Sequence, residues 1–275
     1  MPHPVWLVCS CTHWSLQHSS SNDDACAFGL ESGATVRLTL SGTNVLYSGG
    51  RHAGLEVPDG ASLAVYGSDS GSSLRAKSSL MYSAGAGIGG GYGQAAGDIT
   101  IYGGTIEATS GHGAGIGGGH GGNGGTITIV GGEITATTLW GAGIGGGNEG
   151  DGGTIDIEGG TITAASFYGA GVGGGFRGNG GTITINDGTV TAKAPSTSPQ
   201  PTDMSKIGAA IGGGCGGAGG NITISGGIVT AIASEYNAAI GDGNTANTDV
   251  GLTVTISGGE IVAESCPRIC RSSVQ

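Results

Sequence analysis

The stretch that decides the fold is "HGAGIGGGHGGNGGTITIVGGEITATTL", residues 112–139. The chain repeats it almost unchanged as "WGAGIGGGNEGDGGTIDIEGGTITAASF" (140–167) and as "YGAGVGGGFRGNGGTITINDGTVTA" (168–192). The motif "GAGIGGG", or "GAGVGGG" in its last copy, begins every 28 residues, at Gly85, Gly113, Gly141 and Gly169. A fixed period of this length is typical of a repeat architecture in which each unit forms one turn of a solenoid.

Weaker copies extend the array in both directions. The motif returns as "GAAIGGG" at Gly208 and "AAIGDG" at Ala238, and it is preceded by "FGLESG" at Phe28 and "AGLEV" at Ala53. About eight units therefore cover residues 27–265. We expect residues 1–26 to form an N-terminal cap or leader and residues 266–275 a C-terminal tail or cap. The Pro/Ser/Thr-rich segment near 195–205 is expected to be a surface loop.

Each unit contains two short runs, "TITI" and "TITA", in which aliphatic and polar residues alternate. Alternation with a period of two predicts strands with one buried face. The first run gives two inward columns: Ile99, Ile127, Ile155, Ile183 and Ile222, then Ile101, Ile129, Ile157, Ile185, Ile224 and Ile256. The second run gives Ile106, Ile134, Ile162, Val190 and Val229, and the "GAGIGGG" motif gives Ile88, Ile116, Ile144, Val172, Ile211 and Ile240. Three strands per unit, each pairing with its copy one unit away, predict an all-β parallel β-helix of about eight coils of roughly 28 residues.

The composition supports this prediction and excludes several classes of protein. The 64 glycines lack the three-residue period and the abundant proline of collagen, because the chain has only 7 prolines. A net charge of −11 with 9 scattered Lys and Arg residues argues against a nucleic-acid partner. No apolar run is long enough to predict a membrane span, and the opening "MPHPVWLVCSC" lacks the positive region of a good signal peptide.

Five of the six cysteines lie near the ends of the chain, at Cys9, Cys11, Cys26, Cys266 and Cys270. The spacings in "CSC" and "CPRIC" match no common zinc pattern, so thiols or disulfides of the end caps are favoured over a metal or redox site. The pairing of these cysteines stays open.

The pattern "GAGIGGGxGGxGGTITIxGGTITA" resembles the glycine-rich right-handed parallel β-helix repeats of secreted and cell-surface proteins from anaerobic and gut bacteria, which are often described as carbohydrate-binding-domain-containing or pectin-lyase-like. The resemblance covers residues 85–263. It implies a right-handed β-helix, an extracellular or cell-surface location, and an adhesin or glycan-binding role. It brings no catalytic motif that maps onto this sequence.

Function in a solenoid is expected where aligned copies differ, and aromatic residues gather in two such columns. The position before "GAGIGGG" carries His112, Trp140 and Tyr168, with Phe167 in the adjacent column. A second column beyond the "IGGG" strand carries Tyr92, His120 and Phe176. The two columns are predicted to flank a groove with a floor of glycine residues. The flat aromatic rings of the columns are expected to stack on sugar rings in this groove. The alternative is that the aromatic residues only cover a corner of the core.

A polar column contains Asn123, Asp151 and Asn179, with Glu149 and Arg177 beside it. Oxygen ligands near glycine carbonyls are compatible with calcium, the only cofactor that the sequence suggests. A ladder of Asn and Asp side chains hydrogen-bonded along the stack is favoured over that site, and Glu149 and Arg177 are expected to form an exposed ion pair.

Together with the aromatic columns, the resemblance implies a non-catalytic secreted or cell-surface adhesin that binds a glycan or host carbohydrate, with its oligomeric state open. The first alternative is a β-helix polysaccharide lyase or glycosidase using Asp156, Glu158, Glu107 and Glu133, which are too few and too scattered for a strong prediction. The second is an ice-binding protein using outward Thr pairs such as Thr126/Thr128 and Thr182/Thr184, a row that Asp156 interrupts. Exposed Thr is also simply a good strand former.

Overall fold

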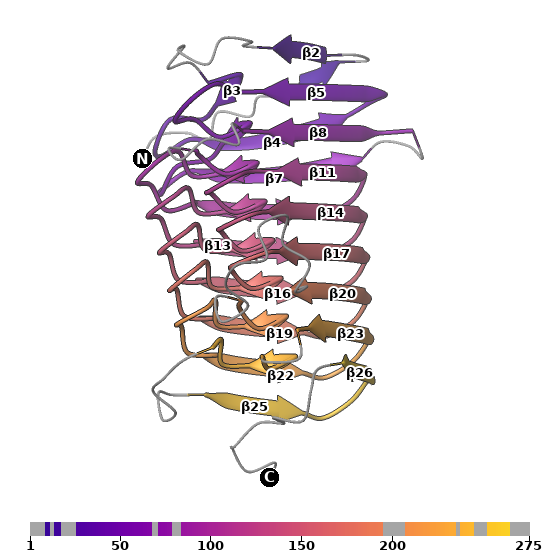
Figure 1. Cartoon of the computed structure of the whole chain (residues 1–275). Helices are drawn as coiled ribbons and strands as arrows, with labels where there is room; N and C mark the ends of the chain where they lie inside the picture. Colours follow the sequence, from indigo (N-terminus) through magenta and orange to yellow (C-terminus); the bar gives the residue numbers. More distant parts are fainter. Residues whose placement is uncertain are drawn as a thin grey trace.

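The computed structural model describes residues 26–67, 71–78, 84–194, 207–234, 237–244 and 252–264, together with the backbone of 9–11 and 14–17. All regular elements among these residues are β-strands, and they form three parallel sheets that run the length of a solenoid (Figure 1). The predicted all-β parallel β-helix is therefore confirmed. No helix in the described residues is long and apolar enough to cross a membrane.

In the described part of the chain, sheets A and B contain nine strands each and sheet C contains eight, and neighbouring strands of a sheet come from successive coils. Sheet A consists of β1 (Cys9–Cys11), β4 (Thr35–Leu40), β7 (Ser62–Gly67), β10 (Asp98–Ile101), β13 (Thr126–Ile129), β16 (Thr154–Ile157), β19 (Thr182–Ile185), β22 (Asn221–Ile224) and β25 (Thr253–Ile256). Sheet B consists of β2 (Trp14–Gln17), β5 (Thr43–Tyr47), β8 (Ser73–Lys77), β11 (Thr105–Thr109), β14 (Glu133–Thr138), β17 (Thr161–Ser166), β20 (Thr189–Ala194), β23 (Ile228–Ala233) and β26 (Glu260–Glu264). Sheet C consists of β3 (Phe28–Gly29), β6 (Leu55–Glu56), β9 (Ile88–Gly89), β12 (Ile116–Gly117), β15 (Ile144–Gly145), β18 (Val172–Gly173), β21 (Ile211–Gly212) and β24 (Ile240–Gly241).

The register of the sheets follows the sequence repeat. Ile127 pairs with Ile99 on one side and with Ile155 on the other, so one period of the sequence is one coil. The weak early copies also join the array, because Phe28 of β3 pairs with Leu55 of β6. Within residues 1–26, β1 and β2 extend sheets A and B by pairing with β4 and β5. The loop predicted near 195–205 and the tail 266–275 lie outside the described residues.

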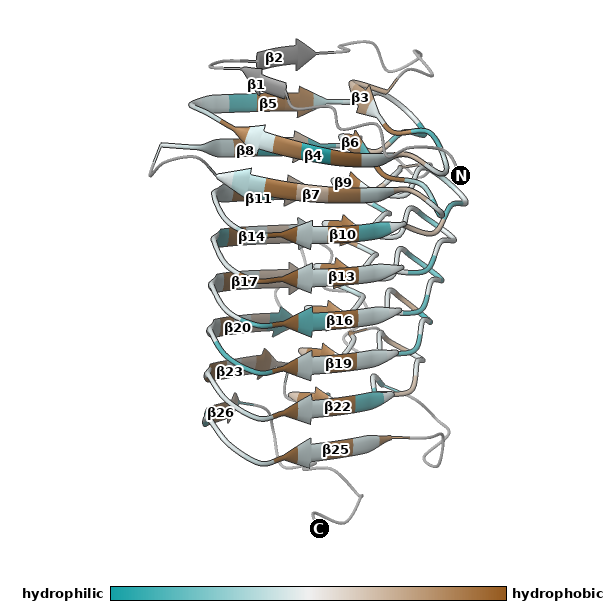
Figure 2. Ribbon diagram, turned by 180° about the vertical axis from the view of Figure 1, so that it is seen from behind, coloured by the Kyte–Doolittle hydropathy of each residue, from teal (hydrophilic) through white to brown (hydrophobic). Residues whose placement is uncertain are grey.

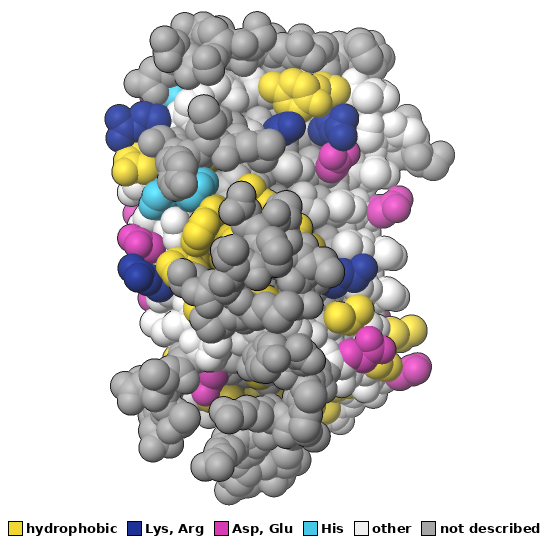
Figure 3. Space-filling view, viewed as in Figure 1, with side chains coloured by type: hydrophobic (Ala, Val, Ile, Leu, Met, Phe, Trp, Pro, Cys, Tyr) yellow, Lys and Arg dark blue, Asp and Glu magenta, His cyan; other side chains and the backbone are white. Residues whose placement is uncertain are grey.

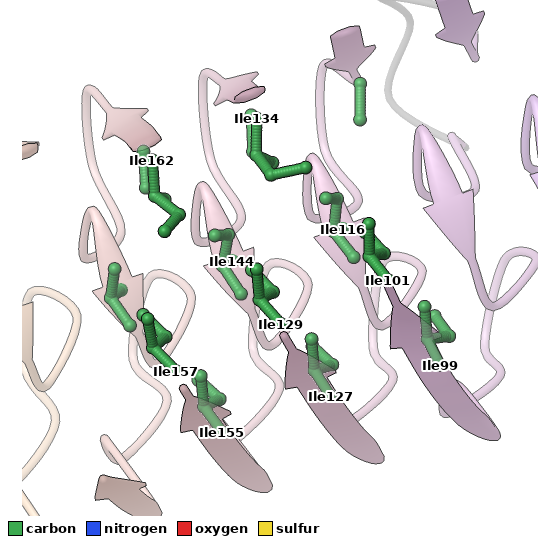
Figure 4. Close-up of a cluster of buried hydrophobic side chains, with 14 of the residues drawn as sticks. Ile99, Ile101, Ile116, Ile127, Ile129, Ile134, Ile144, Ile155, Ile157 and Ile162 are labelled. Carbon is green, nitrogen blue, oxygen red and sulfur yellow. The ribbon is translucent and has the colours of Figure 1, made fainter. Parts of the chain in front are cut away.

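The core consists of aliphatic ladders that run along the solenoid axis. Side chains from all three sheets point inward in successive coils, as Figure 4 shows for the Ile residues of three neighbouring coils. On the strands of sheet A, buried and partly exposed positions alternate, and hydrophobic and polar segments alternate with them (Figure 2). Because a single coil cannot enclose its own Ile residues, stacking of the coils supplies the burial, which is worth about 2 kcal/mol per side chain.

The inward column has one exception at its C-terminal end. Ile256 was predicted to be buried with Ile224, but the side chain is 50% exposed. It lies on β25, and within the described residues no further strand of sheet A stacks beyond β25. The sequence pattern correctly sets the direction of the side chain, but burial also requires a following coil.

Glycine is required where sheet C turns toward sheet A. Gly117 has a φ of 133°, a region that L-residues rarely adopt. A Cβ atom at this position would overlap the carbonyl oxygen of Gly145 in the next coil. The glycine column therefore permits both the turn and the close stacking of coils.

Candidate aromatic and polar site

The first predicted aromatic column lies at the corner between sheets B and C. Trp140 follows β14 and Tyr168 follows β17, while His112 follows β11 one coil earlier. The ring of Trp140 stacks on His112 with centroids 5.5 Å apart and on Tyr168 with centroids 4.1 Å apart, at interplanar angles of 16° and 23°. Because residues 28 positions apart lie side by side in neighbouring coils, the three rings form a continuous ladder.

The second column packs directly against the first. His120 stacks on His112 with centroids 5.5 Å apart, and Phe176 meets Trp140 edge-on at 5.4 Å. Tyr92 contacts His120 edge-on at 5.3 Å. The six rings form one aromatic cluster, which comprises Tyr92, His112, His120, Trp140, Tyr168 and Phe176.

The prediction that the two columns flank a glycine-floored groove is wrong. The chain folds back after sheet C, and the amide of Phe176 donates a 2.9 Å hydrogen bond to the carbonyl of Trp140. The amide of Asn148 likewise donates a 2.8 Å hydrogen bond to the carbonyl of His112. Because these bonds hold the two backbones side by side, their rings fill the space between them.

The rings of the aromatic cluster differ in exposure. His112 is only 5% exposed, Tyr92 is 39% exposed, and His120, Trp140, Tyr168 and Phe176 are half-buried. Figure 3 shows histidine side chains beside a gathering of hydrophobic side chains on this face. Both faces of the Trp140 ring are covered by neighbouring rings, and the guanidinium of Arg51 lies 4.4 Å above Tyr92. The cluster therefore presents mainly ring edges, whereas flat stacking on a sugar needs a free ring face.

Phe167 lies beside this cluster, directly before Tyr168, and is half-buried. Within the described part of the chain, no ring contact joins Phe167 to the six clustered rings.

The polar groups next to the rings are themselves buried. Burial, and then the nearby His120, lower the pKa of His112 from 6.5 to about 4, so the imidazole is neutral at pH 7. Nδ2 of Asn148 lies 3.4 Å from Nδ1 of His112. Oδ1 of Asn148 is buried and accepts no hydrogen bond from any described residue. An unpaired buried acceptor of this kind is costly for the folded protein.

The predicted polar column forms a ladder of hydrogen bonds. Oδ1 of Asn123 accepts a 3.0 Å bond from the amide of Asp151, whose Oδ1 accepts a 2.7 Å bond from the amide of Asn179. Oδ1 of Asn179 accepts a 3.0 Å bond from the amide of Ala218. The hydrogen-bonded ladder is therefore confirmed, and a calcium ion bound by the same three side chains stays a prediction.

Glu149 and Arg177 lie beside this ladder in neighbouring coils. Nη1 of Arg177 is 3.6 Å from Oε1 of Glu149, and both side chains are exposed, which confirms the predicted surface ion pair. Both residues also have positive φ angles, 68° and 67°, at a corner position that Gly121 occupies one coil before Glu149. Arg177 additionally lies 5.2 Å above the ring of Phe176.

The sequence model of the beta helix repeat family matches five segments of the chain, residues 99–120, 123–148, 155–176, 183–215 and 222–244. The matched segments contain five rings of the aromatic cluster and Asn123 of the polar ladder, whereas Tyr92, Asp151 and Asn179 lie outside them. The chain is a parallel β-helix repeat protein. Searches of curated proteins and of solved structures return no significant match.

In this β-helix repeat protein, the acidic residues considered for catalysis do not converge. Glu107 pairs with Arg75 at 2.8 Å, and Glu158 accepts a 2.9 Å hydrogen bond from Asn186. Asp156 lies on sheet A, whereas Glu107 and Glu133 lie on sheet B. The outward Thr residues of sheet A form a row, in which Asp156 stands between Thr128 and Thr184.

Two groups in the β-helix repeat protein were not predicted. Tyr66 and Tyr102 stack with centroids 4.4 Å apart at the corner between sheets A and B, and Arg37 lies 4.2 Å above Tyr66. Aligning Val65 with Ile101, which pair in sheet A, would have revealed this pair. The second group, Cys26, His52 and Glu56, comes from the early coils, where the spacing between copies departs from 28 residues.

Proposed function

We propose that this β-helix repeat protein is a non-catalytic secreted or cell-surface adhesin that binds a glycan at the aromatic cluster. The observation that carries the proposal is the aromatic cluster, in which the half-buried rings of Trp140, Tyr168 and Phe176 pack together at one corner of the solenoid. Apolar ring edges that also carry the indole N–H of Trp140 and the hydroxyl of Tyr168 suit a sugar, which has both C–H surfaces and hydroxyl groups.

The rest of the solenoid is regular, which favours the aromatic cluster as the binding site. The ladders of Ile and the glycine corners recur from coil to coil, whereas the cluster occupies positions at which the copies differ. Residues that vary on an otherwise regular scaffold are where specific recognition is expected. The net charge of −11 favours a neutral glycan over a polyanionic one.

The edges of the rings, rather than their faces, form the proposed contact. Trp140 and Tyr168 cover each other face to face, so a sugar would lie across the row of edges and receive hydrogen bonds from it. This arrangement differs from an open platform for flat stacking.

The proposal is tested on a glycan array probed with the full chain, in calcium and in chelator. Trp140→Ala and Tyr168→Ala should each reduce retention of the bound glycan at least about tenfold, which corresponds to the loss of one good contact. Tyr102→Ala is the matched control, because it removes a stacked tyrosine at another corner. Unchanged binding by both cluster variants, or loss of binding in Tyr102→Ala alone, would refute the proposed site.

A further inference from the structure

Three side chains with metal-ligating atoms converge in the first coils of the solenoid. Cys26 lies just before β3, His52 lies between β5 and β6, and Glu56 is the last residue of β6. One ligand atom from each residue lies within 4.8 Å of the other two. β3 and β6 lie near the same end of the molecule (Figure 2). Arg51, which precedes His52, lies over Tyr92, the first ring of the aromatic cluster.

In the regular coils, the positions equivalent to Cys26, His52 and Glu56 carry small residues, Gly or Ala. Glu56 pairs with Gly89, a member of the glycine column that turns from sheet C. Continuing the pairing of β6 with β9 backwards places His52 beside Gly85, and the pairing of β3 with β6 places Cys26 beside Ala53. The early coils thus replace Gly and Ala with Glu, His and Cys at positions that stacking brings together.

Backbone and side-chain contacts hold the group in place. Nδ1 of His52 is 2.7 Å from Oε2 of Glu56, and the amide of Ala53 donates a 3.2 Å hydrogen bond to the same oxygen. The thiol of Cys26 lies 3.5 Å from the carbonyl of Ala53. Ser48 donates to that carbonyl at 2.6 Å and accepts from the amide of Ala27 at 2.9 Å, so it fixes the backbone on both sides of the thiol.

The three side chains are partly exposed to solvent, and the next coil packs closely against them. The side chains of His52 and Glu56 are 29% and 13% exposed, so solvent reaches both. Gly91 of the next coil lies close to the Glu56 carboxylate, because a Cβ atom at Gly91 would be only 3.2 Å from Oε2 of Glu56. The carboxylate is therefore held against its neighbours from two coils.

We propose that Cys26, His52 and Glu56 bind one Zn²⁺ ion. A thiolate, an imidazole and a carboxylate are the three ligand types that zinc accepts in proteins, and the sulfur and nitrogen disfavour calcium and magnesium. With bonds of about 2.0–2.3 Å in tetrahedral geometry, the ligand atoms lie roughly 3.3–3.8 Å apart. The ligand atoms now lie within 4.8 Å of one another, so side-chain rotations that move them about 1 Å closer together reach that separation. Water supplies the fourth ligand.

Zinc binding requires one proton to leave the site. Burial, and then the Glu56 carboxylate, raise the pKa of the Cys26 thiol to about 11. The thiol is therefore protonated in the metal-free protein at pH 7, and formation of the zinc–sulfur bond releases its proton to solvent. The ion then replaces the hydrogen bond between Nδ1 of His52 and Glu56. Nδ1 loses its proton to solvent while Nε2 takes one up, so the imidazole binds as the other tautomer and the net release stays at one proton. The bound ion joins residues from neighbouring coils.

The experiment is substitution of the reduced full chain with Co²⁺, whose thiolate complexes absorb strongly in the near ultraviolet and, when tetrahedral, in the visible. The unmodified chain should bind one Co²⁺ with both bands, and Zn²⁺ should displace it. Cys26→Ser should abolish the thiolate band, whereas His52→Gln and Glu56→Gln should weaken binding by about 100-fold or more.

Two control variants account for the other cysteines. Cys215→Ser and a chain in which Cys9, Cys11, Cys266 and Cys270 are all Ser should keep the spectrum. Persistence of the thiolate band in Cys26→Ser, or its absence from the unmodified chain, would overturn the proposal. Should Cys26→Ser fail to fold by circular dichroism, the other two ligand variants decide, because unchanged affinity in both overturns the site. None of these readouts depends on glycan binding.

Discussion

The amide of Asn179 donates a 2.7 Å hydrogen bond to Oδ1 of Asp151 in the preceding coil. Asp151 thereby satisfies a backbone group that lies at a corner, outside the three sheets. The bond is one step in a ladder that starts at Asn123, so the polar side chains at this corner extend the hydrogen-bond network of the sheets.

Replacing Asp151 therefore tests whether the ladder is structural. Asp151→Ala should lower the free energy of unfolding by about 1 kcal/mol, whereas Asp151→Asn, which keeps an acceptor oxygen, should stay within about 0.5 kcal/mol of the unmodified chain. Urea unfolding followed by circular dichroism measures both. The same titrations with calcium or chelator test the calcium prediction, because an ion held by Asp151 would make stability depend on calcium.

The stack of Trp140 on Tyr168 predicts a measurable coupling between the two rings. Trp140→Ala, Tyr168→Ala and the double variant form a mutant cycle, and the coupling free energy should be about 0.5–1.5 kcal/mol. A coupling near zero would show that the rings stabilise the corner independently. The pair Tyr66 and Tyr102, with a closely similar centroid distance of 4.4 Å, provides a second cycle for comparison.

The alternation within each strand predicts opposite results for neighbouring residues. Ile129 is fully buried and Thr128 faces outward on the same strand. Ile129→Ala should lower stability by about 2–5 kcal/mol through lost burial and a cavity, whereas Thr128→Ala should change it by less than about 1 kcal/mol. Comparable losses in both variants, measured by urea unfolding, would contradict the assigned faces of sheet A.

Most of the fold could be predicted from the sequence because the repeat states the same local pattern several times. The period locates the neighbours of Ile127, and the alternation assigns its face, without any knowledge of distant contacts. Ile256 shows the limit of this reasoning, since its burial depends on a following coil and not on its own strand.

The site was harder to predict because its geometry depends on how a corner folds back. The sequence correctly aligned His112, Trp140 and Tyr168, but spacing alone does not show that the amide of Phe176 bonds to the carbonyl of Trp140. That backbone contact converts two separate columns into one packed cluster. Cys26, His52 and Glu56 were missed since coils of irregular length hide which residues are neighbours.

The glycine column predicts a large loss of stability from a small change. Gly117→Ala places a Cβ against the carbonyl of Gly145 and forces an L-residue to a φ of 133°. It should destabilise the protein by at least about 3 kcal/mol. Gly103→Ala is the matched control, because its Cβ would approach only the amide nitrogen of Gly67, at 3.9 Å, and it should be nearly neutral. Equal thermal unfolding midpoints for the two variants would refute the steric argument.

The neutral, buried His112 predicts a specific loss of stability in acid. Its pKa is about 4 in the folded chain and 6.5 as the ordinary value, so between these pH values the unfolded chain binds more protons. Stability is thus unaffected by this residue above pH 6.5 and falls as the pH drops from 6.5 to 4. The difference corresponds to at most about 3 kcal/mol. His112→Gln removes the titrating group while keeping a polar side chain of similar size. The unmodified chain should lose more stability than His112→Gln between pH 7 and pH 4 in urea titrations, and parallel losses in the two proteins would show that His112 is not the group responsible.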